Sequence, residues 1–176
     1  LGDRGRLYLP EALAQAMIEK LLPRADIITP NSFELGYLAG MPVSGRATAE
    51  TAAQHLITTT HLAAVIATGI DGGIDGGIDG GIDGGIDDGT HDRSGGVGDL
   101  LVMRSGGTIW CDAGPDGRNV AGGGDLLTAI LAGQLARGAT IEAAFRVASQ
   151  TAQQIIAASI SPRDLALLEN LDRVAA

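Results

Sequence analysis

The chain has 176 residues, of which 45% are hydrophobic and 19% charged, with a formal net charge of −9 and a mean hydropathy of +0.19. This length and composition predict one globular domain with a sizeable core, and the acidic balance argues against nucleic acid, which binds basic surfaces. No apolar run approaches the roughly 20 residues that span a bilayer, and the single cysteine, Cys111, excludes an internal disulfide and fits a reducing, cytoplasmic compartment.

The first part of the chain alternates between helical and strand patterns. A helix is expected over residues 11–22, where Pro23 ends it. Its apolar face carries Leu13, Met17 and Leu21. The elements expected next are a strand over 25–29, helices over 32–39 and 47–60, and a strand over 62–67. This alternation favours an α/β fold with a parallel sheet.

A low-complexity repeat follows the second strand. From Ile70 to Asp87 the chain repeats Ile-Asp-Gly-Gly four times and closes with Ile-Asp. Glycine at half of the positions makes a packed helix or strand costly, so we interpret residues 70–88 as an expanded surface loop without chemistry. A weak calcium-binding role is the alternative, although calcium-binding β-rolls use a nine-residue unit.

The second half of the chain predicts a hairpin and then helices. Strands are expected over 99–103 and 108–111, with a turn at 105–107 between them. The helices expected after them are one that starts at the glycines 122–124 and ends near Gly138, one over 141–158 capped by Thr140, and a last amphipathic one over 162–174 with Leu165, Leu168 and Leu171.

Three glycines, Gly122 to Gly124, lead directly into Asp125 and a helical pattern. A glycine turn at a helix N-terminus leaves free backbone N–H groups at the positive end of the dipole, which is an anion site. A carboxylate beside a bound phosphate would be repelled unless it had a task there, such as taking a proton from an attacking hydroxyl. Alternatively, Asp125 only complements the dipole of a core helix. The residues by themselves leave both interpretations open.

The segment Asn31-Ser-Phe-Glu34 opens the helix after the first strand. Asn with Glu three residues later is a capping-box spacing. Such turns also collect at the carboxyl ends of strands, where ligands bind, and there Asn31 or Glu34 could hold a hydrated Mg²⁺. The sequence has no Walker motif, no His-Glu-x-x-His and no Gly-x-Ser-x-Gly. The two segments together therefore suggest phosphoryl transfer without a P-loop.

Three segments resemble the ribokinase-like vitamin kinases. Thr29-Pro-Asn-Ser-Phe-Glu-Leu35 is similar to their Thr-Pro-Asn-x-x-Glu motif, and Val120-Ala-Gly-Gly-Gly-Asp-Leu-Leu127 to their Gly-Thr-Gly-Asp signature. Leu1-Gly-Asp-Arg-Gly-Arg-Leu-Tyr-Leu-Pro10 resembles the end of the Asp-Pro-Val-Met-Gly-Asp-x-Gly-Arg-Leu-Tyr-Val-Pro segment of the pyridoxal kinases. The resemblance runs in order across almost the whole chain, apart from the repeat.

The resemblance implies a three-layer ribokinase-like α/β sandwich with a mostly parallel central sheet. Residues 1–176 would form the C-terminal, nucleotide-binding part of that kinase domain, with residues 70–88 as a loop inserted in it. The implied reaction is the phosphorylation, by ATP with Mg²⁺, of the 5′-hydroxymethyl group of pyridoxal, pyridoxine or pyridoxamine in vitamin B6 salvage. Family members are usually homodimers, so we expect a homodimer in the full-length protein, with no nucleic-acid or membrane partner.

The glycine turn takes its implied roles from the Gly-Thr-Gly-Asp signature. Asp125 matches the catalytic base, and Gly122, Gly123 and Gly124 match the anion hole for the transferring phosphoryl group. Gly123 departs from the pattern, because Thr is usual there. The change keeps the backbone donors but loosens the loop.

The other implied positions would bind ATP and magnesium. Glu34, with Asn31, matches the acidic motif that acts on Mg²⁺, Glu34 indirectly through water. Thr68 matches a position that touches the nucleotide, and Asp3 matches the last acid of Asp-Pro-Val-Met-Gly-Asp. The first acid of that segment, and the N-terminal half with most of the vitamin pocket, would precede Leu1. We therefore expect the chain to be inactive alone.

Two alternatives stay open at this point. One is a hydroxymethylpyrimidine (phosphate) kinase of the same superfamily, which differs from a pyridoxal kinase in vitamin-pocket residues that would lie before Leu1. The other is a catalytically inactive fragment or a calcium-binding protein built on the repeat.

Overall fold

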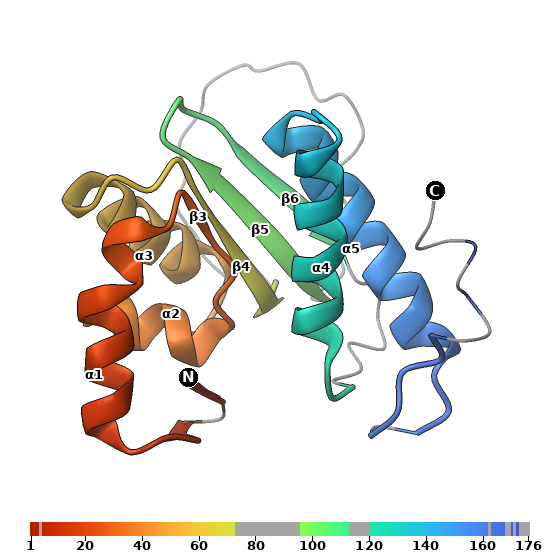
Figure 1. Cartoon of the computed structure of the whole chain (residues 1–176), viewed down its shortest axis with the longest axis horizontal. Helices are drawn as coiled ribbons and strands as arrows, with labels where there is room; N and C mark the ends of the chain where they lie inside the picture. Colours follow the sequence, from red (N-terminus) through yellow and green to blue (C-terminus); the bar gives the residue numbers. More distant parts are fainter. Residues whose placement is uncertain are drawn as a thin grey trace, which may run out of the picture.

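The computed structural model of the chain describes residues 1–3, 5–72, 96–112, 120–161, 163–167, 170 and 172. The described elements, in chain order, are β1 Gly2–Asp3, β2 Arg6–Leu7, α1 Glu11–Lys20, η1 Leu22–Arg24, β3 Ile27–Ile28, α2 Ser32–Ala39, α3 Arg46–Thr59, β4 Ala64–Asp71, β5 Val97–Met103, β6 Thr108–Asp112, α4 Gly123–Ala136 and α5 Ile141–Ala158. β1 and β2 pair antiparallel as a separate two-stranded hairpin, and the other strands form a sheet with helices on both faces (Figure 1).

The main described sheet has the strand order β3-β4-β5-β6. β3 and β4 pair in parallel, which confirms the parallel arrangement expected for the first two strands. β4 and β5 pair antiparallel, as do β5 and β6. The β5–β6 hairpin turns through Gly106 and Gly107, whose φ angles of 94° and 95° are left-handed. The α/β class is confirmed, and within the described strands the sheet is mixed.

The two faces of the sheet are buried under different helices, which makes three layers. On one face, Ala64 and Ile66 of β4 pack with α4 and α5. On the other face, Val65 and Ala67 pack with α2 and α3. The apolar run at 62–67 is continuous, rather than alternating, because successive side chains enter two different cores. α4 and α5 lie side by side in Figure 1 and share the first core.

Local capping signals placed several helices correctly. α2 begins after Asn31, whose side chain accepts from the Glu34 amide, and it ends at Gly40 in the left-handed conformation, φ 67°. The Thr140 hydroxyl accepts from the Ala143 amide at the start of α5, as predicted. α3 begins one residue earlier than expected, because Gly45 is its N-cap.

The prediction of the first helix was wrong in part, both in its end and in its buried face. The first helix ends at Lys20 rather than residue 22, and Pro23 lies inside the 3-10 turn that follows it. Leu13 and Leu21 are 48% and 55% exposed, whereas the buried residue of α1 is Ala14. Periodicity identified an amphipathic helix, but the elements around α1 decide which side is covered.

The last predicted helix, over 162–174, does not form between residues 163 and 167. There the chain is held by tertiary contacts: the Ser159 hydroxyl accepts from the Ala166 amide at 3.0 Å, and Leu165 packs against the core under α4 and α5. These contacts take the place of local helical hydrogen bonds. Leu168 and Leu171 lie outside the described residues.

The start of the repeat belongs to the sheet. Ile70 and Asp71 are the last residues of β4, and Ile70 is fully buried, so the expected loop does not begin at residue 70. Residues 73–95 lie outside the described part of the chain, and with them most of the repeat, its interpretation as a loop without chemistry, and the calcium-binding alternative. Among the described helices, none is long and apolar enough to cross a membrane.

Candidate phosphate-binding site

The glycine turn opens α4 as predicted. Gly122 is the N-cap, with a left-handed φ of 87° that favours glycine. The Gly123 amide donates to the Val120 carbonyl at 3.0 Å. The amides of Gly124 and Asp125 donate to no acceptor within the described residues. These first-turn amides are the donors that can bind an anion at a helix N-terminus.

Among the described residues, nothing lies close in front of this turn. A Cβ atom added to Gly124 would meet none of their atoms within 4 Å, and Asp125 is exposed. Gly123 faces the other way: it is buried, and a Cβ atom there would lie 3.0 Å from the Ile156 Cδ1 atom of α5. A threonine at this position would require the end of the Ile156 side chain to move by a few tenths of an ångström. The turn is therefore open on the Gly124 side and packed on the Gly123 side.

Asn31 and Glu34 form the capping box that their spacing predicted. The Asn31 side-chain oxygen accepts from the Glu34 amide at 2.9 Å, and the Glu34 Oε2 atom accepts from the Asn31 amide at 3.1 Å. Glu34 Oε1 also accepts from the amino nitrogen of Leu1 at 2.7 Å and from the Gly2 amide at 3.2 Å. The box thus fastens β1, and with it Asp3, to the start of α2.

Thr68 lies beside this box. The Thr68 amide donates to the Pro30 carbonyl at 2.9 Å, and Thr68 forms a parallel bridge with Asn31. The bridge places Thr68 in the second half of β4, which continues to Asp71, and next to the residue that caps α2 after the end of β3. In α/β sheets the carboxyl ends of the strands are where ligands bind.

A pair of hydroxyl groups joins this edge to the glycine turn. Thr29 Oγ1 lies 2.9 Å from Thr128 Oγ1, and the Thr128 hydroxyl donates to the Gly124 carbonyl at 2.8 Å. Because Thr128 uses its only proton for Gly124, the Thr29 hydroxyl is the donor between them. Figure 1 shows the starts of α2 and α4 at the same edge of the sheet.

The sequence did not single out Thr128. No local pattern marks it, because its partner Thr29 lies 99 residues away.

Asp99 of β5 also lies near this edge, and its role was missed from the sequence. It is 7% exposed, and its two carboxylate oxygens accept from the Gly69 amide at 3.0 Å and from the Ser149 hydroxyl at 2.7 Å. Burial raises the pKa of Asp99, and these hydrogen bonds, with one from Gln153, oppose the shift. The sequence feature that could have identified it is an acidic residue at the start of an otherwise apolar predicted strand.

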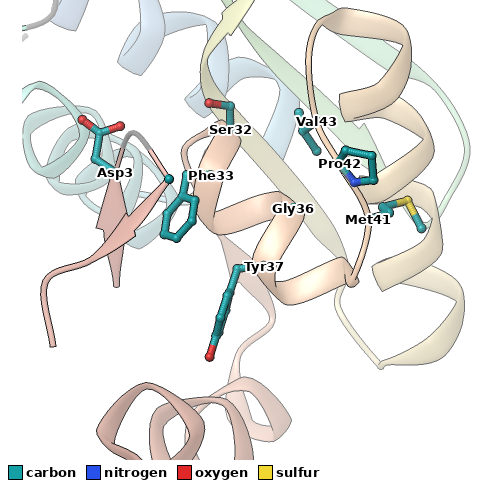
Figure 2. Close-up of a pocket in the computed structure, with 9 residues that line it drawn as sticks. Asp3, Ser32, Phe33, Gly36, Tyr37, Met41, Pro42 and Val43 are labelled. Carbon is teal, nitrogen blue, oxygen red and sulfur yellow. The ribbon is translucent and has the colours of Figure 1, made fainter. Parts of the chain in front are cut away.

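A separate cavity of about 460 Å³ lies on the outer side of α2 (Figure 2). Figure 2 shows Asp3 on the β1–β2 hairpin at one side, Phe33 and Tyr37 on α2, and Met41, Pro42 and Val43 on the segment that follows α2. Asp3 is the predicted site residue that lines it; Thr68 and the glycine turn do not. The structure therefore brings Asn31, Glu34, Thr68 and the glycine turn to one edge, and it places Asp3 beside this cavity.

The chain is similar to known proteins in sequence and in fold. The family model described as phosphomethylpyrimidine kinase matches residues 2–167. A putative pyridoxal kinase of Caenorhabditis elegans is 35% identical over 72 residues, which are 41% of this chain and 22% of that protein.

Two solved structures are similar over 99% of this chain and 55% of their own chains. The pyridoxal kinase of Entamoeba histolytica has a TM-score of 0.75 at 24% identity, which shows that the two proteins share a fold. The pyridoxal kinase of Leishmania donovani in complex with ADP and pyridoxamine has a TM-score of 0.71 at 27% identity. The chain thus spans about half the length of these kinases. The expected resemblance and the ribokinase-like fold are confirmed, and the chain belongs to the phosphomethylpyrimidine kinase family.

Proposed function

We propose that the chain is the C-terminal, nucleotide-binding part of a kinase that phosphorylates the 5′-hydroxymethyl group of pyridoxal, pyridoxine or pyridoxamine with ATP and acts in vitamin B6 salvage. The observation that carries the proposal is the hydrogen bond between Thr29 and Thr128, which holds the glycine turn of α4 beside Asn31 and Thr68. Relatives named pyridoxal kinase, one solved with ADP and pyridoxamine, support the substrate class.

In the proposed reaction the vitamin hydroxyl oxygen attacks the γ-phosphorus of ATP. Asp125 takes the hydroxyl proton, a new P–O bond forms to the vitamin, and the bond to the β-phosphate oxygen breaks to release ADP. The turn at Gly122 to Gly124 stabilises the charge on the moving phosphoryl group, chiefly through the Gly124 amide, because the Gly123 amide already donates to the Val120 carbonyl. Two features of this chain suit these roles: the Gly124 amide, which donates to no acceptor among the described residues, and the exposed Asp125 carboxylate.

Mg²⁺ would be held at the Asn31–Glu34 edge, where it supplies positive charge to the nucleotide phosphates when bound. The donor set fits an indirect contact. Glu34 Oε1 already accepts two N–H groups and Oε2 accepts one, which leaves Oε2 a lone pair for a metal-bound water. No group of three or more His, Cys, Asp or Glu side chains among the described residues could hold a metal directly.

A hydroxymethylpyrimidine (phosphate) kinase is the second candidate, favoured by the description of the matching family model. The kinases named among the relatives favour pyridoxal instead. A cytoplasmic location and a homodimer of the full-length protein complete the proposal. Cys111, buried and without a disulfide, suits a reducing compartment.

Two measurements test the proposal. Calorimetric titration with Mg²⁺-ATP should show binding to the 176-residue chain, and absence of binding would overturn the nucleotide-binding assignment. The longest reading frame that contains this chain should then transfer phosphate from ATP to pyridoxal, whereas the 176-residue chain alone should not. Faster transfer to hydroxymethylpyrimidine than to any B6 vitamer would favour the second candidate.

A further inference from the structure

Strand β4 contains a bulge opposite Asp99. Ala67 pairs with Leu100 and Ile70 pairs with Gly98, so Thr68 and Gly69 together face the single residue Asp99. Gly69 has a left-handed φ of 62°. The extra residue interrupts the ladder, and the Gly69 amide donates to the Asp99 carboxylate at 3.0 Å instead of to a strand carbonyl.

The carboxylate is itself held from behind by helix α5. Asp99 Oδ2 accepts from the Ser149 hydroxyl at 2.7 Å and from the Gln153 amide group at 3.4 Å, and Gln153 also donates to Ser149 Oγ at 2.9 Å. No buried side-chain nitrogen or oxygen among the described residues lacks a hydrogen-bond partner. Hydrogen bonds to both carboxylate oxygens therefore fix the orientation of the Asp99 side chain.

Stability alone does not explain an acid at this position. A buried carboxylate costs free energy that its hydrogen bonds only partly offset, and well-packed apolar residues commonly replace such groups without loss. The residues that follow, Leu100 to Val102, are apolar and buried. What an apolar side chain cannot do is accept the Gly69 amide and so fix the bulge.

The bulge sets the direction of Thr68, whose amide turns to the Pro30 carbonyl and which pairs with Asn31. We propose that Asp99 is a positioning residue for the nucleotide: its carboxylate fixes the bulge that presents Thr68 beside Asn31. This inference rests on the proposed function, because it requires that Thr68 touch ATP.

Helix α5 contacts both Asp99, which fixes the bulge, and the glycine turn. Ser149 and Gln153 hold Asp99, and one turn further along the same helix Ile156 packs against Gly123. One helix therefore supports both the bulge that holds Thr68 and the glycine turn of α4.

A double-mutant cycle on the 176-residue chain tests the inference, with calorimetric binding of Mg²⁺-ATP as the readout. Asp99→Ala and Thr68→Ala should each weaken binding at least about fivefold, and the double variant should bind no more weakly than Thr68→Ala, because Asp99 acts through Thr68. Asp99→Asn keeps an oxygen for the Gly69 amide and should retain most of the affinity. Asp26→Ala, which removes an exposed acid, controls for the change in net charge.

The outcomes separate the two proposals. Normal ATP binding by Asp99→Ala, or independent, multiplying losses in the double variant, would overturn the positioning role while leaving the proposed function intact. Wild-type chain that does not bind ATP would overturn both. The Gly69 amide signal in NMR spectra gives a direct check, since it should shift in Asp99→Ala and stay in place in Asp99→Asn when the rest of the spectrum is folded.

Discussion

The Thr29 hydroxyl lies 2.9 Å from the Thr128 hydroxyl and joins the loop before α2 to the first turns of α4. Thr128→Val keeps a side chain of similar size but removes the hydrogen bonds to Thr29 and to the Gly124 carbonyl. We expect phosphoryl transfer by the full-length protein to fall about tenfold or more, because small misplacements of reacting groups cost up to about a hundredfold. Steady-state kinetics with pyridoxal measure the effect.

A matched control exists on α3. The Thr51 hydroxyl donates to the Ala47 carbonyl at 2.9 Å, as Thr128 does to Gly124, but the structure records no second hydroxyl as its partner. Thr51→Val should leave transfer unchanged. Equal losses in both variants would show that the bond from Thr to the helix backbone matters and the link to Thr29 does not.

Asp125 is expected to act on the reaction and not on binding. Asp125→Ala should lower kcat by about a hundredfold to ten-thousandfold, as loss of a general base does, while the dissociation constant of ATP changes little. Glu142 is the corresponding first-turn acid of α5 and serves as the control, since Glu142→Ala removes a similar charge from a helix start. Near-normal turnover of Asp125→Ala would exclude the catalytic role.

Two neighbouring glycines should separate stability from phosphate binding. Gly122 has a φ of 87°, so Gly122→Ala should lower the free energy of unfolding by about 1–2 kcal/mol. Gly124 is helical with open space around it, so Gly124→Ala should keep or raise stability by up to about 1 kcal/mol. Its new methyl group would nevertheless stand where phosphate approaches, and ATP binding should weaken.

Urea unfolding and ATP titration of both glycine variants provide the check. If Gly124→Ala bound ATP as tightly as the wild type, the open face of the turn would not be the phosphate site.

Local signals determined how much of this fold could be predicted. The Asn31 cap and the Gly40 terminus placed α2 correctly, because both act within one helical turn of the ends they define. The helix expected over 162–174 failed at 163–167, where Ser159 and the α4–α5 core hold the chain. The Asp99 site escaped prediction because the Gly69 amide is 30 residues away from it.

The repeat should be dispensable if it is a loop without chemistry. Because Ile70 is fully buried in β4, a deletion must spare it, and removal of residues 74–88 is the suitable variant. We expect unchanged ATP binding and no response to Ca²⁺ up to millimolar concentration in either chain. Ile70→Ala is the contrasting variant and should cost about 2–5 kcal/mol of stability. A Ca²⁺-dependent change in circular dichroism that the deletion abolishes would favour the calcium-binding alternative.

Asp99 should make stability depend on pH in a defined direction. Burial raises its pKa in the folded chain, so the folded state holds the proton more tightly than the unfolded state. This difference stabilises the folded chain at pH values below the pKa that Asp99 has in the unfolded chain. The stabilisation is lost as the pH rises through the pKa that Asp99 has in the folded chain. Ionised Asp99 is therefore a cost at neutral pH, and Asp99→Asn removes the titration.

We expect the free energy of unfolding of the wild type, relative to that of Asp99→Asn, to rise as the pH falls from about 8 to about 4. Burial also raises the pKa of the neighbouring Cys111 thiol, which therefore stays neutral over this range. Urea unfolding of both proteins at several pH values measures the difference, and Asp26→Asn serves as the exposed-acid control. A difference that shrinks toward low pH would mean that the Asp99 carboxylate is better stabilised in the folded chain than in the unfolded chain, through its Gly69 and Ser149 hydrogen bonds. A constant difference would mean that folding leaves the pKa of Asp99 unchanged.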